Sequence, residues 1–432
     1  MSSLTLDNIL AKLYCAGGAV QTYEIMLRSL RKSLMALFLP MAIVLGTYFV
    51  LQSAPKVHPA ILNLYTYFPY AVLAVGLLLA WRFNRARAFF PLVLLSVCYW
   101  AVQSYIAGKT NLQSDVYFAL MCLLLPVNYL IFVLLAERGI FTRRGIIRIV
   151  FIAAQVLMAV LLVRYALKPA SDMLYRIIDT SGWLPSRQIP QLAQPVFAFS
   201  LLVVIARVFQ KRNAVEGGLA ASLLSMVLAF EYIGNQFLMI SYFSVAAFVV
   251  VMTVIQDSWQ MAYVDELTSL PGRRALNEQL LKLGQVYTIA MVDVDHFKKF
   301  NDTYGHDVGD QVLRYVAARM ESVGSGGRAY RYGGEEFTLL FPGRSMAECK
   351  DALQRVHQAI GESRFALRAK DRPKTRPESP VQSKQLAQGV QITVSIGVAS
   401  CKNGNMTPRE VIKQADGALY KAKGDGRNRI RS

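Results

Sequence analysis

The sequence predicts a two-part protein: a multi-span α-helical membrane domain followed by a globular domain that contains both strands and helices. Three observations predict this division. Long apolar runs crowd residues 34–255, the later residues alternate charge, glycine and short apolar stretches, and an unbroken segment joins the two parts. With 54% hydrophobic and only 17% charged residues among 432, the chain is too apolar for an ordinary soluble protein.

Eight segments of the first part have the length and composition of membrane-spanning helices. A helix needs about 20 mainly apolar residues to cross the hydrocarbon core of a bilayer. The sixth segment is the shortest, and residues 1–33 precede the first as an N-terminal segment. The predicted spans are 34–51, 61–81, 88–107, 116–136, 146–163, 193–206, 217–234 and 237–255.

Basic residues gather before the first span and in alternate connections, which indicates an orientation. The first and third connections carry little beyond Lys56 and Lys109, and the fifth, around 164–192, is long enough to hold a surface helix. Because short basic loops stay in the cytoplasm, both termini are predicted to be cytoplasmic. The clusters are Arg28, Arg31 and Lys32; Arg82, Arg85 and Arg87; Arg138, Arg143 and Arg144; and Arg207, Lys211 and Arg212.

The formal net charge of +19 does not predict a nucleic-acid-binding protein. Much of the Lys and Arg lies in the short connections, where topology and anionic membrane lipid account for it. No nucleic-acid-binding signature accompanies the charge. The five cysteines, at 15, 98, 122, 349 and 401, show neither CxxC pairing nor metal-ligand spacing and are interpreted as inert thiols.

Polar residues near the outer end of the seventh span leave two interpretations open. Glu231, Asn235 and Gln236 could form a site that senses a ligand or a proton, or they could be interfacial residues. A transporter or receptor whose globular domain is incidental is the less favoured class, because the sequence shows no repeated halves and no intramembrane charge pair. The sensed stimulus is not identified by any of these residues.

Residues 251–263, VMTVIQDSWQMAY, contain no glycine or proline, so the last span can continue into the globular part as one helix. Ile255, Trp259 and Ala262 recur at spacings of four and three. That pattern fits a short seam between two copies of the chain, and a plain connector fits it nearly as well.

The first chemical signal is a pair of aspartates after an apolar run. Residues 286–293, VYTIAMVD, predict a buried strand that ends in a carboxylate, followed by a helix around 301–320. Asp293 and Asp295 are two residues apart, so in an extended chain both side chains project to one face. The pair suits a divalent cation, and a solvated turn is the alternative.

The second signal is the segment RYGGEEFTLL at 331–340. Gly333 and Gly334 stand between β-prone residues, which predicts a hairpin whose backbone a phosphate or base can approach closely. Glu335 and Glu336 follow directly, and adjacent carboxylates repel unless a positive charge lies near them. The sequence therefore predicts a divalent metal, Mg²⁺ or else Mn²⁺, beside this turn.

Five motifs in order give the chain from 264 to 432 a resemblance to the GGDEF family of diguanylate cyclases, of which GGEEF is an accepted form. They are DELTSLPGRR, DVDHFKKFNDTYGHDVGD, RYGGEEF, TVSIGVA and ADGALYKAKGDGRNR. The resemblance implies an α+β fold similar to the palm of polymerases and adenylate cyclases. It also implies an enzyme of the bacterial inner membrane that condenses two GTP into cyclic di-GMP and two pyrophosphates as a homodimer, under control of the membrane domain.

The resemblance also implies roles for individual residues. Asp293, Glu335 and the Val294 carbonyl resemble the Mg²⁺ ligands, and the residues counted as catalytic are Asp293, Glu335, Glu336 and Lys298. Glu336 either assists the metal or the 3′-hydroxyl, or is a neighbouring charge. The residues that resemble GTP contacts are Asn301 and Asp310 at the guanine edge, Lys298, Lys423 and Arg427 at the phosphates, Gly333 and Gly334 beneath the nucleoside, and Phe297 and His306.

Two departures from the family pattern carry expectations. Gly324 and Gly327 stand where many relatives have the Arg and Asp of a product-inhibition site, so inhibition through that surface is expected to be weak or absent. Residues 364–384 are Pro-rich and basic, which predicts a mobile connector or a contact with lipid or nucleotide. A binding module that holds nucleotide without catalysis is the main alternative, although the acids and glycines expected of an active member are present.

Overall fold

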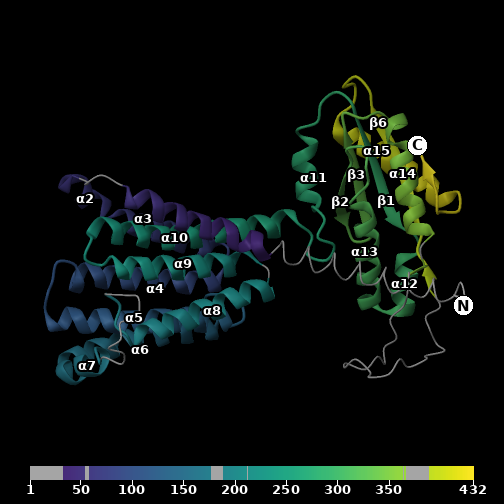
Figure 1. Cartoon of the computed structure of the whole chain (residues 1–432). Coiled ribbons are helices and arrows are strands. Elements are labelled where there is room, and N and C mark those ends of the chain that lie inside the picture. Colours follow the sequence, from purple (N-terminus) through teal and green to yellow (C-terminus); the bar gives the residue numbers. More distant parts are fainter. Residues whose placement is uncertain (1–32, 54–57, 177–187, 212, 363, 366–388) are drawn as a thin grey trace, which may run out of the picture. The chain divides into compact units, whose positions relative to one another are not determined.

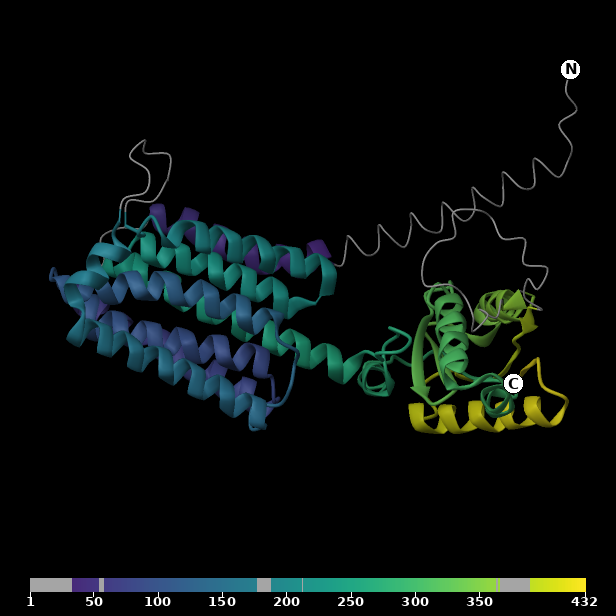
Figure 2. The same ribbon diagram turned by 90° about the horizontal axis from the view of Figure 1, so that it is seen from below.

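The computed structural model describes residues 33–53, 58–176, 188–211, 213–362, 364–365 and 389–432. The chain divides into a helical unit, Met1–Ser258, and a globular unit, Trp259–Ser432 (Figures 1 and 2). Residues 1–32 and nearly all of the basic stretch 364–384 lie outside the described residues, so the predictions for these segments stay untested.

All eight predicted spans form helices. Among the described residues, eight helices are long and apolar enough to cross a membrane. The sixth is longer than predicted, because the helix continues through the basic residues to Lys211. The helices are Ser33–Gln52; α2 Pro59–Tyr65 with α3 Phe68–Arg82; α4 Ala86–Ala101 with the π-helical turn η1 Val102–Ile106; α5 Leu112–Leu134; α6 Arg143–Tyr165; α8 Ala193–Lys211; α9 Ala214–Glu231; and α10 Gln236–Tyr263. The fifth connection contains a short helix, α7 Leu167–Leu174.

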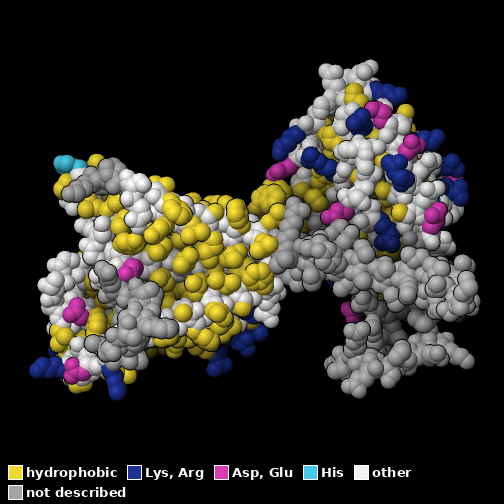
Figure 3. All heavy atoms as spheres, in the orientation of Figure 1, with side chains coloured by type: hydrophobic (Ala, Val, Ile, Leu, Met, Phe, Trp, Pro, Cys, Tyr) yellow, Lys and Arg dark blue, Asp and Glu magenta, His cyan; other side chains and the backbone are white. Residues whose placement is uncertain are grey.

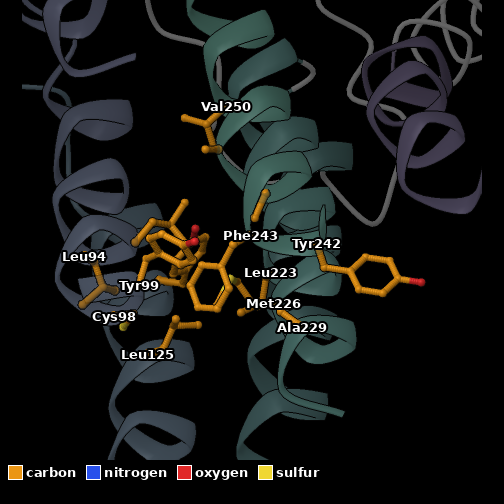
Figure 4. Packing of buried hydrophobic residues seen from close by; sticks show 14 of the residues in the cluster. Leu94, Cys98, Tyr99, Leu125, Leu223, Met226, Ala229, Tyr242, Phe243 and Val250 are labelled. Atoms are coloured by element: carbon orange, nitrogen blue, oxygen red, sulfur yellow. The ribbon is translucent and has the colours of Figure 1, made fainter. Parts of the chain in front are cut away.

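Apolar packing between helices far apart in sequence forms the centre of the helical unit. The rings of Tyr99 on α4 and Phe243 on α10 lie 5.0 Å apart inside this cluster (Figure 4). Helix α10 also packs closely on its neighbours, since a Cβ atom at Gly218 of α9 would lie 2.4 Å from Thr253. Small residues at such contacts let helix backbones approach, as in helix pairs within membranes.

The space-filling view shows a hydrophobic middle on one face of the helical unit, with charged side chains towards its two ends (Figure 3). Alternate connections meet at one of these ends. Arg87 and Arg207 both donate to the carbonyl of Val133, and Arg85 forms a 2.8 Å ion pair with Asp257 of α10.

The structure contains a buried charge pair that the sequence did not predict, at two residues just outside the predicted spans. Arg87 on α4 contacts Glu216 on α9 at 2.5 Å, and both residues are buried. The sequence did not reveal the pair because its members are 129 residues apart and Arg87 was assigned to a solvated basic loop. Both are near helix N-termini, so the pair ties the ends of α4 and α9 together.

The globular unit is built on a five-stranded sheet in the order β2-β3-β1-β6-β7. The four long strands pair antiparallel, and the short β7 pairs parallel to β6. A separate two-stranded pair, β4 Arg364–Phe365 and β5 Val390–Gln391, flanks the basic stretch. The strands of the main sheet are β1 Tyr287–Val294, β2 Arg328–Gly333, β3 Glu336–Pro342, β6 Val394–Cys401 and β7 Ile430–Arg431.

Helices cover both faces of this sheet, which makes its central strand the most buried part. All eight residues of β1 are buried, as the apolar run predicted. On one face the core includes α13 His306–Met320 and α14 Met346–Gly361, and on the other α11 Arg273–Leu280 and α15 Pro408–Gly424. Alternate residues of β1 serve the two cores, Ile289 and Met291 facing α15 while Ala290 and Val292 face α13.

The helix expected around 301–320 is two helices. The first, α12 Phe297–Tyr304, begins earlier than expected, and Gly305 separates it from α13. Gly305 has φ of +86°, a left-handed conformation that glycine adopts without strain.

Candidate functional site

The candidate site lies at the end of β1, where three acidic residues and a lysine converge. Asp293 faces Glu336 directly across the β1–β3 ladder, and the Val294 amide donates to the Glu335 carbonyl at 3.4 Å. The Nζ of Lys423, from the end of α15, lies 2.8 Å from Asp293 Oδ2. Since Asp293 shares the sheet face of Ile289 and Met291, α15 is the helix that supplies its counter-charge.

The predicted hairpin between β2 and β3 is present: Gly333 ends β2 and pairs with Glu336, and Gly334 and Glu335 form the turn. Gly334 has φ of +50°, and a Cβ atom at Gly333 or Gly334 would meet nothing within 4 Å, so the turn is open to a ligand. Arg331 holds the turn from behind: it donates to the Gly334 carbonyl at 2.8 Å and contacts both oxygens of Asp265 at 2.8 and 2.9 Å. Nη1 makes both contacts to Asp265 while Nε and Nη2 donate to the Gly334 carbonyl, and together these bonds fix the guanidinium plane and the hairpin.

Asp295 does not share the position of Asp293, although the two acids were expected on one face. Its carboxylate accepts from the hydroxyls of Thr393 and Ser395 at 2.8 and 2.6 Å, and from the backbone N–H of Asn428 at 3.0 Å. The chain leaves the strand after Val294, so alternation no longer applies. Asp295 instead fastens the loop that carries Arg427 to the end of the sheet.

The two predicted guanine contacts lie on α12 and α13. Asn301 is packed against Gly309, and its buried Oδ1 has no hydrogen-bond partner among the described residues. Asp310 follows Gly309 and is half-buried. Buried polar atoms normally have a hydrogen-bond partner. The unpaired Oδ1 of Asn301 is therefore available to accept a hydrogen bond from a ligand.

The remaining predicted contacts differ in how they can reach a nucleotide. Lys298 on α12 and His306 at the start of α13 are exposed, and Arg427 is half-buried with φ of +64°. The ring of Phe297 is 7% exposed and belongs to the core beneath α12. Its ring therefore faces the core, and the predicted GTP contact of Phe297 stays a prediction that only its backbone can fulfil.

Burial acts on all three carboxylates of the site. Burial raises the pKa of Asp293, and the hydrogen bond and charge of Lys423 oppose that rise. Burial and then the charge of Asp293 raise the pKa values of Glu335 and Glu336. Directly opposed like charges destabilise a sheet, so the three acids favour a nearby positive charge.

The acids fit a magnesium ion that is shared with phosphate. Within the described ranges, no group of three or more His, Cys, Asp or Glu could hold a metal by protein side chains alone. Mg²⁺ needs only one or two carboxylates together with waters and phosphate oxygens. Asp293 and Glu335 supply that number. Burial raises the pKa of both carboxyls, and the charge of Asp293 raises that of Glu335 further, so a divalent cation would stabilise their charged forms.

The two glycines that replace the product-inhibition residues of many relatives lie where larger side chains fit poorly. Gly324 has φ of +80°, in the left-handed region. A Cβ atom at Gly327 would lie 2.5 Å from the ring of Phe341 and 2.7 Å from Val323. The turn between α13 and β2 is therefore packed around glycine.

Sequence reasoning missed three contributors to the site: Asp265 and Arg331, which hold the hairpin, and Gly309, which makes space for Asn301. All three lie inside the five motifs. Membership in a motif therefore indicated that these residues matter. It did not indicate their contacts, because these join segments far apart in sequence, such as Asp265 and Arg331 at a separation of 66 residues.

Burial by itself would raise the pKa of Asp265, yet hydrogen bonds from Thr268 and Arg331 bring that pKa below its ordinary value. Asp265 therefore remains charged and keeps the hairpin clamp closed at neutral pH.

Comparison with known proteins identifies the globular unit. The sequence model of the family described as "Diguanylate cyclase, GGDEF domain" matches residues 262–376 and 374–429. Among curated proteins, the response regulator PleD of Caulobacter vibrioides is 33% identical over 184 residues, which cover 41% of this chain and 37% of PleD. The diguanylate cyclase VdcA of Vibrio cholerae is 39% identical over 173 residues, which cover 39% of this chain and 46% of VdcA.

The aligned regions thus span less than half the length of these two relatives. Among solved structures, the coiled coil and GGDEF domain of DgcB from Caulobacter crescentus, in complex with c-di-GMP, is 31% identical. That match covers 41% of this chain and 88% of the DgcB chain, with a TM-score of 0.36.

Proposed function

We propose that this chain, whose residues 262–429 form a GGDEF domain, is a membrane-anchored diguanylate cyclase that condenses two GTP molecules into cyclic di-GMP and two pyrophosphates. One observation carries the proposal: Asp293 at the end of β1 lies beside the diglycine hairpin and its acids, with Lys423 as counter-charge. Acids and a cation at an open glycine turn suit a triphosphate that brings its own metal.

In this proposal the residues of one domain bind and orient one GTP. Asn301 and Asp310 hydrogen-bond the guanine edge, where a carboxylate accepts from donors that adenine lacks. Gly333 and Gly334 admit the nucleoside against the backbone.

Basic residues and the acids share the triphosphate end. Lys298, Lys423 and Arg427 bind the phosphates as cations. Asp293, Glu335 and the Val294 carbonyl would hold Mg²⁺, or Mn²⁺ in its place. When bound, the metal would neutralise phosphate charge and polarise the α-phosphate.

The reaction requires two domains, because each site holds one GTP. The 3′-hydroxyl of one ribose attacks the α-phosphorus of the other GTP, and pyrophosphate leaves. Glu336, opposite Asp293, is placed to influence that hydroxyl or to support the metal. Alignment of the two reactants by a homodimer is the main source of rate available to such a site.

The helical unit is proposed to anchor the cyclase in the bacterial inner membrane and to control its dimerisation. Eight apolar helices and the clustering of alternate basic connections at one end support a multi-pass topology with both termini in the cytoplasm. Helix α10 runs without interruption from this unit to Tyr263, and Ile255 and Trp259 are exposed on it. Contact between two copies of α10 along these residues would couple the helical unit to dimerisation of the globular unit.

Product analysis tests the proposal. Detergent-purified full-length protein is incubated with GTP and Mg²⁺, and nucleotides are separated by chromatography beside the Glu335→Gln variant. We expect cyclic di-GMP from the wild type only. If the wild type binds GTP but forms no cyclic dinucleotide at any protein concentration, the chain is a nucleotide-binding module and the cyclase proposal is wrong.

A further inference from the structure

The helical unit contains an apolar cavity between α4, η1, α5 and α6. It encloses about 130 Å³, and Leu94, Cys98 and Leu125, labelled in Figure 4, belong to its wall. An apolar cavity of about 150 Å³ in a protein core can hold a benzene molecule. The cavity therefore has room for one six-membered ring, and its hydrocarbon wall disfavours nucleotides and other charged ligands.

One end of the cavity is lined by three aromatic rings in contact. The rings of Trp100 and Tyr105 lie 5.5 Å apart, and those of Tyr105 and Tyr117 lie 5.1 Å apart. Trp100 and Tyr105 are 48% and 39% exposed, so this end of the cavity reaches the outer surface of the helical unit. Tyr105 lies in η1, and π-helical turns of this kind frequently mark functional sites.

A side-chain amide provides a polar group in this otherwise apolar wall. Gln155 lines the cavity from the middle of α6, and its Oε1 accepts from Asn128 Nδ2 at 2.7 Å. The same Nδ2 donates to the Leu124 carbonyl, also at 2.7 Å, which fixes the orientation of the Asn128 amide. Gln155 Nε2 has no acceptor among the described residues, so its N–H groups remain as donors.

These observations specify a ligand. The volume fits one ring, the aromatic rings offer faces for stacking, and Gln155 offers a hydrogen bond to an acceptor that has no charge. An open end on the surface proposed to face lipid lets an apolar tail leave the cavity.

We propose that this cavity binds the head of a membrane-soluble, quinone-like molecule: a ring that bears a carbonyl oxygen and an apolar tail. Gln155 Nε2 donates to the carbonyl, and Trp100 and Tyr105 contact the ring. This proposal does not depend on the proposed cyclase activity, because the cavity lies entirely within the helical unit.

Tryptophan fluorescence with decylubiquinone as the probe tests the proposal on the full chain in lipid nanodiscs. In one variant Trp81, Trp183 and Trp259 are replaced by Phe, which leaves Trp100 in the cavity wall. In the matched reference Trp100, Trp183 and Trp259 are replaced, which leaves Trp81, 53% exposed on α3 and not part of the wall.

We expect saturable quenching of Trp100 and only linear quenching of Trp81, which reports probe dissolved in the bilayer. In the Trp100 background, Ala159→Phe fills the cavity and should abolish saturation. Gln155→Leu retains side-chain size and should raise the half-saturating probe concentration about tenfold, as expected for one lost hydrogen bond. Decylbenzene, which lacks the carbonyl, should displace decylubiquinone and restore Trp100 fluorescence only at a concentration about tenfold above the half-saturating concentration of the quinone, without any change in the cavity.

Identical linear quenching of Trp100 and Trp81 would overturn the proposal. Saturation that is unchanged in Gln155→Leu, together with equal competition by decylbenzene, would also overturn it, because Gln155 would then serve only as an interhelical hydrogen bond. The decylbenzene measurement decides the matter even if a cavity variant fails to fold.

Discussion

Replacement of Gly309 by alanine should damage guanine recognition while the domain stays folded. A Cβ atom at Gly309 would lie 1.8 Å from Asn301 Oδ1 and 2.9 Å from Asn301 Cγ. Real Cβ contacts stay above 3.0 Å, so the oxygen must withdraw by at least 1.2 Å. The obstructing atom is the end of a side chain that can rotate, so the helix itself need not move.

The size of the effect follows from the hydrogen bond that Asn301 would lose. A displaced or unpaired polar group in a binding site costs about 1–3 kcal/mol, which corresponds to a fall in kcat/KM for GTP of about fivefold to about 150-fold. Folding stability should not fall in parallel, because alanine is favoured over glycine within a helix by about 1 kcal/mol.

Steady-state cyclase kinetics and thermal unfolding together provide the assay. Gly417→Ala on α15 is the matched control, since a Cβ atom there meets nothing within 4 Å. A double-mutant cycle adds the mechanism: in an Asn301→Ala background, Gly309→Ala should cost almost nothing further. If Gly309→Ala alone leaves kcat/KM within about twofold of wild type, or adds its full cost in the Asn301→Ala background, the reasoning is refuted.

Three further predictions concern the same domain. Asp295→Asn should raise the KM for GTP about tenfold, more than it lowers kcat, because one amide cannot accept all three hydrogen bonds that hold the loop of Arg427. Asp425→Asn, at an exposed position, is the control. Equal kinetics for the two variants would contradict the prediction. Glu335→Gln should abolish product formation yet raise the melting temperature of the nucleotide-free protein. The pKa of Glu335 is higher in the folded than in the unfolded state, so its charge destabilises the fold at neutral pH and acidification relieves that penalty. Calorimetry that shows a lower melting temperature for the variant at pH 7 would count against this prediction. Gly327→Asp should destabilise the fold by about 1–3 kcal/mol through its contact with Phe341 rather than create an inhibitory site, and the wild type should show no noncompetitive inhibition by cyclic di-GMP through this turn; denaturant unfolding and inhibition kinetics check both statements.

Much of the element pattern could be predicted because it depends on local periodicity. The eight apolar runs became helices, the run 286–293 became the buried β1, and the diglycine segment became the turn between β2 and β3. Each of these rests on neighbours in sequence: hydrophobic length for a helix, alternation for a strand, and glycine conformations for a turn.

The errors arose where a residue's role depends on what packs against it from elsewhere. Asp295 was expected on the face of Asp293, but two hydroxyls and a backbone N–H from distant segments hold its carboxylate elsewhere. Arg87 was assigned to a basic loop, but it is buried in contact with Glu216, which lies on a helix 129 residues later in the sequence. Helix α12 ends at Gly305 because a positive φ is required there, which the periodicity of apolar residues does not encode.

The sequence by itself determined which chemical groups are present and in what order: the acids, the glycine turn, the basic C-terminal residues and the apolar runs long enough to span a bilayer. These are properties of composition and short-range spacing. Tertiary structure alone decided that Asp293 meets Lys423, that Asp295 turns away to fasten a loop, and that Gln155 presents its amide to an apolar cavity. Such pairings depend on which helix covers which face, and that arrangement is set by the packing of the whole core rather than by any one segment.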